Sequence, residues 1–230
     1  MLKHGAIVAG TLLVSACVWS GAETGPLEHE HTVINLERPQ LTRVRLMMGS
    51  GELEVNGGAT SLADADFLYN VPAWKPDVAY HPGALTISHP SGSLGFRGNT
   101  KNHWRIGLND GVPVEVVARL GAGEARLTLG SLDLRRVELN LGAGEADVDL
   151  RGTPKTSYSV SLHGGVGEAR VHLPSHVAIS ANASGGIGSI NVRGLEKRNG
   201  RWINARADDS PVLIELDIHG GIGEISIDAQ

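Results

Sequence analysis

Apolar and polar residues alternate along most of the chain, which is the pattern of half-buried β-strands. The alternation becomes regular from Val112 onward, and in the run from Val114 to Leu120 every second position is apolar. No segment of the sequence places apolar residues at the spacing of an amphipathic helix. We therefore predict an all-β fold with essentially no helix outside the N-terminal leader.

A short phrase, Gly-x-Gly-Glu, interrupts the alternation at regular intervals. Its middle copies begin at residues 121, 142, 165 and 186, a period of 21–23 residues, and further copies begin at 49 and 221. Each copy lies between two strand-like runs, and glycine allows the backbone to turn tightly between them. A unit of this size buries its apolar face only by stacking on its neighbours. The sequence thus predicts a right-handed β-solenoid or β-helix-like fold with two strands per repeat.

The interval between the copies that begin at 186 and 221 is longer than the others by about one hairpin. Asn199-Gly200 lies within it, between strand-like residues. Asn-Gly is a strong signal for a two-residue β-hairpin turn. We predict a hairpin at this position.

The acidic residue of the phrase invites a functional interpretation. Stacked repeats would align these carboxylates in a row, which is an arrangement suited to binding an ion. The calcium-binding nonapeptide, however, needs Asp where this chain has Ala169 or Ile225. The dinucleotide fingerprint fails as well, because Arg126 replaces its third glycine. We favour glutamates that solvate the turns, sometimes paired with a nearby Arg. As a candidate surface we retain Glu52, Glu124, Glu145, Glu168 and Glu224.

The N-terminus has the features of an export signal. A basic start precedes the apolar stretch from Ala6 to Val14, which is too short to span a bilayer. The stretch ends in Val14-Ser-Ala-Cys17, which looks like a bacterial lipobox, so we predict a signal peptide over residues 1–16 and a lipid on Cys17. The protein would then be anchored on the exported side of a membrane of the cell envelope. Cleavage after Ala22 is the alternative and would release a secreted, soluble protein.

The composition of the chain limits the covalent cross-links and the partners that it can have. The chain has a single Cys, so it forms no intramolecular disulfide, and 20 Lys and Arg stand against 25 Asp and Glu. A mildly acidic balance argues against a nucleic-acid partner. Membrane attachment is expected through the lipid alone.

Candidate chemical sites are few. Residues 17–31 read as a flexible tether that ends in Glu28-His-Glu-His31, and two His without a third ligand are weak evidence for a metal. The Asp64/Asp66 and Asp208/Asp209 pairs lack a basic or nucleophilic partner in the sequence. We predict no metal, no cofactor and no catalytic residue, and hence a protein that is not an enzyme.

Several longer motifs resemble those of the bacterial toast-rack proteins. They are Met48-Gly-Ser-Gly-Glu-Leu-Glu-Val55, Tyr69-Asn-Val-Pro-Ala-Trp-Lys-Pro76, Asn102-His-Trp-Arg-Ile-Gly-Leu108 and the later Gly-x-Gly repeats. The resemblance implies an N-terminal toast-rack region over residues 32–110 and a repeat region over 111–230 similar to the C-terminal domain of LiaF-like proteins. It implies a β-solenoid-like fold at the cell envelope and supplies no established catalytic residues.

Our leading interpretation is an envelope lipoprotein whose β-solenoid is a non-catalytic interaction or scaffold domain for an envelope protein or a glycan. LiaF-like proteins restrain an envelope-stress sensor kinase, so a regulator of that type is the alternative. A carbohydrate-binding or carbohydrate-active protein is the third, because Trp74, Trp104 and Trp202 could stack on sugars.

Overall fold

The computed structural model describes residues 24–90, 99–206 and 208–230, and nearly all of its regular structure is β. One 3₁₀ turn, η1, covers Pro72–Trp74. The strands are β1 (Glu28–Ile34), β2 (Thr42–Asn56), β3 (Ala63–Tyr69), β4 (Asp77–His81), β5 (Ala84–Ser88), β6 (Asn102–Leu108), β7 (Val114–Thr128), β8 (Leu134–Asp149), β9 (Tyr158–Leu173), β10 (Ala178–Arg193), β11 (Glu196–Arg198), β12 (Arg201–Ile203) and β13 (Leu213–Ala229).

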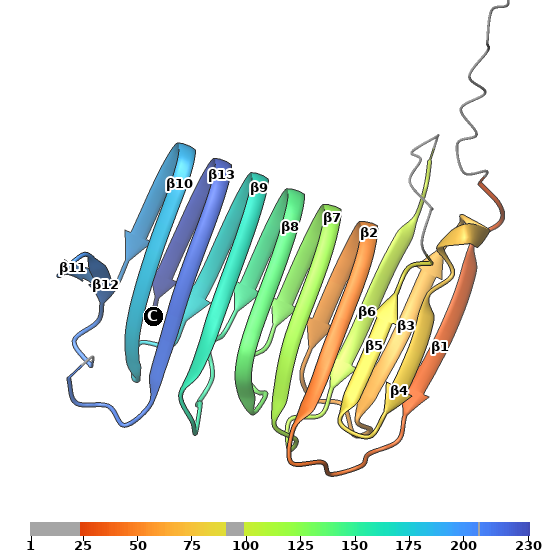
Figure 1. The fold of residues 1–230 in the computed structure, drawn as a ribbon, viewed down its shortest axis with the longest axis horizontal. Helices are drawn as coiled ribbons and strands as arrows, with labels where there is room; N and C mark the ends of the chain where they lie inside the picture. Colours follow the sequence, from red (N-terminus) through yellow and green to blue (C-terminus); the bar gives the residue numbers. More distant parts are fainter. Residues whose placement is uncertain (1–23, 91–98, 207) are drawn as a thin grey trace, which may run out of the picture.

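Six long strands form the body of the molecule, and each bends back on itself at its Gly-x-Gly phrase (Figure 1). We call each bent strand a rung and the stack of rungs the rack. The two strands predicted per repeat are the two arms of one such bent strand. β2 shows the arrangement, since its first arm pairs with β5 and its second arm with β6. The arms therefore build two layers, joined along one rim by the glycine turns. The sheet stays open, and the all-β prediction is confirmed.

The glycines at the rim are required by the close approach of neighbouring turns. The second glycine of every phrase has a positive φ, as at Gly144 (+132°). A Cβ atom on Gly144 would lie 1.8 Å from the carbonyl oxygen of Gly123 in the next rung. L side chains rarely adopt this backbone conformation, and no atom fits at that distance. The turn geometry thus explains why the phrase recurs.

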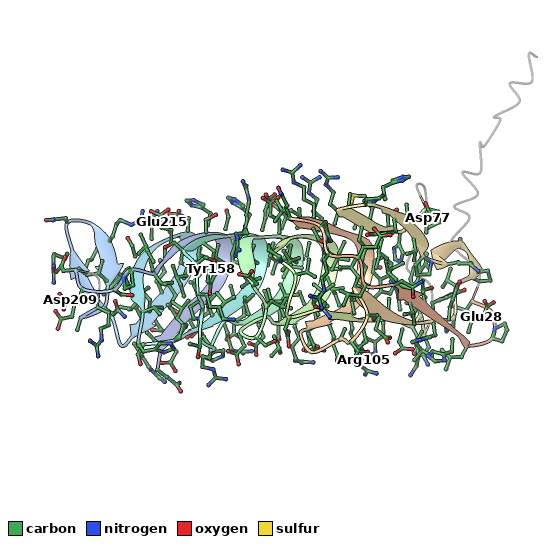
Figure 2. The ribbon with its side chains drawn as sticks, turned by 90° about the horizontal axis from the view of Figure 1, so that it is seen from below. Glu28, Asp77, Arg105, Tyr158, Asp209 and Glu215 are labelled. Atoms are coloured by element: carbon green, nitrogen blue, oxygen red, sulfur yellow. The ribbon has the colours of Figure 1, made fainter. Side chains whose placement is uncertain are left out.

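The core lies between the two layers. The inward residues of both arms are buried, including Val116, Leu127 and Leu139, whereas most outward residues are polar or charged. Seen from below, Glu215 and Arg105 project from opposite faces and Tyr158 lies between them (Figure 2). The period-2 pattern predicts these faces because successive side chains of a strand point in opposite directions.

The order of the rungs differs from their order in the chain. β13 is inserted between β9 and β10 and pairs in parallel with both, so the spatial order is β2, β7, β8, β9, β13, β10. The predicted hairpin is confirmed: β11 and β12 pair around Asn199 and Gly200, whose φ angles are +50° and +83°. β12 then covers only two residues of β10, which leaves the rest of that strand at an edge.

One prediction needs correction, one residue departs from the alternation, and the N-terminal predictions lie outside the described residues. The predicted tether is too long, because β1 begins at Glu28 and pairs with β3 through Ile34. Ile190 continues the inward pattern of β10 but is 40% exposed, since this arm lies at the sheet edge. The predicted signal peptide and Cys17 lie outside the described residues.

The two predicted regions share one sheet. β2, from residues 32–110, pairs residue by residue with β7, from residues 111–230. Their buried side chains belong to one hydrophobic cluster.

Candidate functional site

The rim of the rack differs between its two halves at the residue that precedes each Gly-x-Gly turn. In the three rungs nearest the N-terminal end this inward position holds Met48, Leu120 and Leu141, all buried. In the other three rungs the aligned residues are Gly164, Gly220 and Gly185. Three large apolar side chains are therefore replaced by hydrogen atoms under the rim of β9, β13 and β10.

The middle residue of the turn becomes larger in the same three rungs in which the preceding residue becomes glycine. It is Ser50, Ala122 and Ala143 in the first three rungs and Val166, Ile222 and Ile187 in the others. These last three side chains are 54%, 52% and 70% exposed, respectively. We call Val166, Ile222 and Ile187 the apolar rim.

A pocket lies beneath the apolar rim because its glycines leave space there. Its lining combines the rim with buried core residues, namely Leu139, Leu141, Leu162, Ile218 and Ile225. A Cβ atom on Gly164 would meet no atom within 4 Å, whereas Ile225 partly fills the space at Gly220. The cavity volume is about 80 Å³, smaller than the roughly 150 Å³ cavity that accepts benzene. It suits one aliphatic side chain.

Two histidines, His163 and His219, are among the residues that line this pocket. The imidazole rings of His163 and His219 stack with their centres 5.3 Å apart, and Ser184 Oγ lies 2.7 Å from His219 Nδ1. His172 lies on the opposite face, with its Nε2 atom 3.7 Å from Asp147 Oδ1. The structure therefore brings together two of the three histidines near the repeat turns.

The glutamates of the repeat stand in a row across the second-arm face. Glu52, Glu124, Glu145, Glu168 and Glu224 occupy equivalent positions, and Ser189 ends the row beside Glu224. Arg126 pairs with Glu124 and also reaches Glu54. Arg170 pairs with Glu168 and reaches Glu145. Pairing across the rungs offsets the repulsion within the row, as expected for charged residues that solvate a sheet face.

Glu54 lies one row further along the same face, between Arg105 and Arg126. Its burial raises the pKa of the carboxyl group, but the hydrogen bond from Arg105 Nε (3.0 Å) and the charges on His103 and both arginines outweigh this effect. The pKa of Glu54 is therefore below its ordinary value. The carboxylate stays ionised and helps to hold β2 and β6 together.

The other candidate residues do not line the pocket. Asp208 forms an ion pair with Arg198, and both side chains are exposed. Trp74 and Trp104 are buried and Trp202 is half-buried with Lys197 over its ring, so no open aromatic platform exists among these three. Asp64 and Asp66 lie on β3, facing the histidines of β1.

The pocket was not predicted, although the sequence carries a signal for it. Gly164-Gly165, Gly185-Gly186 and Gly220-Gly221 double the first glycine of the phrase, and the earlier copies do not. The extra glycine is not needed for the turn. Aligning the phrases and asking which inward side chain is missing would have located the pocket.

Fold and site together define a class: an open, two-layer β-rack with an apolar pocket under one end of its rim. The chain belongs to the toast-rack family, since residues 23–172 match the model of the N-terminal domain of toast_rack. The resemblance inferred from the motifs is confirmed to that extent.

Similar chains exist among solved structures, of which the first shares the fold. A candidate cell adhesion protein from Clostridium sporogenes is 30% identical, with 89% of this chain and 100% of that chain covered and a TM-score of 0.86. A candidate adhesin from Bacteroides fragilis is 12% identical, with coverage of 86% and 97% and a TM-score of 0.36. None of the curated proteins matches the chain. Within the described residues, no helix is long and apolar enough to cross a bilayer.

Proposed function

We propose that this chain is a non-catalytic binding module of the cell envelope that holds a protein partner at the apolar rim. The observation that carries the proposal is the exposure of Val166, Ile222 and Ile187 around the pocket. Of eight large apolar side chains exposed in the described parts of the chain, these three and Ile190 lie at this end of the rack. Contiguous exposed apolar groups rimmed by polar residues mark interaction sites.

The pocket favours a protein over a glycan as the partner. Aliphatic side chains and glycines predominate in its lining, to which no Phe, Tyr or Trp contributes, whereas sugars are bound by stacking on aromatic rings and by dense hydrogen bonding. A partner side chain such as Leu or Ile would fill the empty space at Gly164, which corresponds to the space that Leu141 occupies in the neighbouring strand β8. His163 and His219 supply polar contacts at the edge. The 30% identical candidate cell adhesion protein supports adhesion as the setting in which such a contact is used.

The anchor in this proposal is a lipid on Cys17, with the rack on the exported side of the membrane and residues 18–27 as the tether. A fatty-acid probe should label the wild-type protein and not Cys17→Ala. Equal labelling of the two proteins would refute the lipid anchor without touching the rim.

The rim itself is tested by photo-crosslinking in intact cells. A crosslinking amino acid at position 187 should yield a discrete protein adduct, and one at Thr128, which is exposed on the second arm of β7, should not. Adducts of equal yield at both positions, or none at 187, would contradict the proposal. A glycan adduct at 187 would favour the carbohydrate-binding alternative.

A regulator of envelope stress would use the same surface with a signalling protein as its partner. Deletion of the gene should then alter cell-wall-stress transcription, and the charge-bearing variant Ile187→Asp should reproduce the effect. Unchanged transcription in the deletion strain would leave adhesion as the proposed role.

A further inference from the structure

Two histidines of β1 and two aspartates of β3 face one another on the outward side of the second layer. The antiparallel register places His31 directly opposite Asp66, with His29 and Asp64 one diagonal step to either side. Residues two apart on a strand point to the same face. The register therefore gathers four side chains of metal-ligating type at one place, although Glu28-His-Glu-His31 alone offers only two histidines.

The distances between these side chains are those of a shared ligand set. His31 Nδ1 lies 3.0 Å from Asp66 Oδ1 and 3.6 Å from Asp64 Oδ1, and His29 Nε2 lies 3.2 Å from Asp66 Oδ1. Ligands at about 2.1 Å from a tetrahedral Zn²⁺ ion are separated by about 3.4 Å. Ligand atoms of His31, Asp64 and Asp66 all lie within 4.8 Å of one another. In the described ranges no other group of three His, Cys, Asp or Glu side chains converges in this way.

We propose that His29, His31, Asp64 and Asp66 form a zinc site that fastens β1 to the rack. Imidazole nitrogen and carboxylate oxygen together suit Zn²⁺ better than Ca²⁺ or Mg²⁺, which take oxygen ligands. The side chains are between 37% and 63% exposed, so an ion reaches them without any opening of the fold. Arg105 is the nearest cation by register, and its Nε atom donates to Glu54 at 3.0 Å, away from Asp66.

An ion at this site would stabilise the pairing of β1, the first strand of the sheet, with β3. β1 is an edge strand that pairs only with β3, and it follows directly on the segment that would lead to the membrane anchor. An ion bound across β1 and β3 stabilises that pairing, because a ligand that binds only the folded state raises its stability. Zinc would thus strengthen the point at which pulling force from an anchor enters the fold.

The test uses the full chain and ZnCl₂ alone as the probe, with calorimetric titration and the thermal midpoint as readouts. Wild type should bind one Zn²⁺ per chain and unfold at a higher temperature when zinc is present. Asp66→Asn and His31→Gln should each lower the affinity at least tenfold and remove the thermal shift. His172→Gln is the matched control, since His172 lies among Asp147 and Asp149 on the same face, where no three ligand atoms of the described residues converge.

Absence of saturable zinc binding in wild type would overturn the proposal, and so would equal losses in His31→Gln and His172→Gln. The folded state of each variant is verified by its far-ultraviolet circular dichroism. If Asp66→Asn does not fold, Asp64→Asn and His31→Gln decide the question. Substitution with Co²⁺ adds a spectroscopic readout, because a tetrahedral nitrogen and oxygen site gives an intense visible band that a His–Asp ion pair does not.

Discussion

The two ends of the rack use the same bent strand for different purposes. In β2, β7 and β8 the position below the turn is filled by Met48, Leu120 and Leu141, and the turn itself carries small residues. In β9, β13 and β10 that position is glycine and the turn carries Val or Ile. One repeat thus supports a closed end that is packed for stability and an open end that exposes apolar surface. The pocket exists because glycine at these positions leaves out the side chains that fill the same space at the closed end.

The largest loss of stability is expected when a strand of the closed end receives glycine in place of the buried side chain below its turn. Leu120→Gly should lower the free energy of unfolding by about 3–5 kcal/mol, because it leaves a cavity among fully buried neighbours. Denaturant unfolding measures the change. A loss below about 1 kcal/mol would mean that the closed end does not depend on this packing.

A second pair of variants separates the glycines of the turn from the glycines of the pocket. Gly144→Ala should cost about 2–4 kcal/mol, since it combines a positive φ with a clash against backbone. Gly164→Ala should be neutral or stabilising, because its Cβ atom enters open space. Measured side by side, the unfolding curve of Gly144→Ala should shift to lower denaturant concentration and that of Gly164→Ala should not. A comparable loss in both variants would contradict the assignment.

Acid should weaken the closed end first. His89 is packed against the rings of Trp74 and Trp104, and its Nδ1 atom accepts a hydrogen bond from Gly49 N at 3.1 Å. Burial lowers the pKa of His89, and the contact with Asn102 opposes this only in part. The unfolded chain therefore binds a proton that the folded state resists, so stability is fully present above about pH 6.5 and falls at lower pH.

Hydrogen exchange resolves that effect along the chain. Amides near Gly49 should lose protection between pH 7 and pH 5 before those near Gly165 do, after correction for intrinsic exchange. His89→Gln should abolish the difference between the two turns. The same order of loss in His89→Gln as in wild type would contradict the role of this histidine.

The smallest effect is expected on the charged outer face of the second layer, where the side chain of Arg126 is 52% exposed. Arg126→Gln should lower the free energy of unfolding by less than about 1 kcal/mol, because exposed ion pairs are weak. The loss should disappear in about 1 M salt. Thr128→Ser on the same strand serves as the control. A larger, salt-independent loss would show that the glutamate row has a structural role that the interior alone does not explain.

The sequence predicts the local features of this fold well. Alternation locates the arms, the Gly-x-Gly phrases locate the rim, and Asn199-Gly200 locates the hairpin, because each depends on residues close together in the chain. The insertion of β13 was not predictable in this way, since β9, β10 and β13 carry the same inward pattern. The inward side chains of β13 are covered by strands on both sides, whereas Ile190 is exposed because β10 lies at the edge of the sheet.

The candidate sites were less predictable because they depend on which strands become neighbours. Asp64 and Asp66 lie more than thirty residues from His29 and His31, and only the β1–β3 register joins them. The pocket likewise needs the alignment of Gly164, Gly220 and Gly185 in adjacent rungs. The glutamate row was predictable from the repeat, and whether it has a function beyond solvating the face stays a prediction.

The central claim is that the open end is a binding site because it lacks the side chains that fill the closed end. Gly164→Leu restores to β9 the residue that β8 has at Leu141, and nothing lies within 4 Å of the new Cβ atom. The variant should be at least as stable as wild type, with a gain in the free energy of unfolding of up to about 1 kcal/mol. Ala143→Val is its control, because it adds bulk to the rim outside the pocket.

The decisive measurement is the yield of the protein adduct from a crosslinker at position 187, compared in the Gly164→Leu and Ala143→Val backgrounds. We predict at least a tenfold loss of the adduct with Gly164→Leu and an unchanged yield with Ala143→Val. An unchanged yield in a folded Gly164→Leu protein would contradict the account.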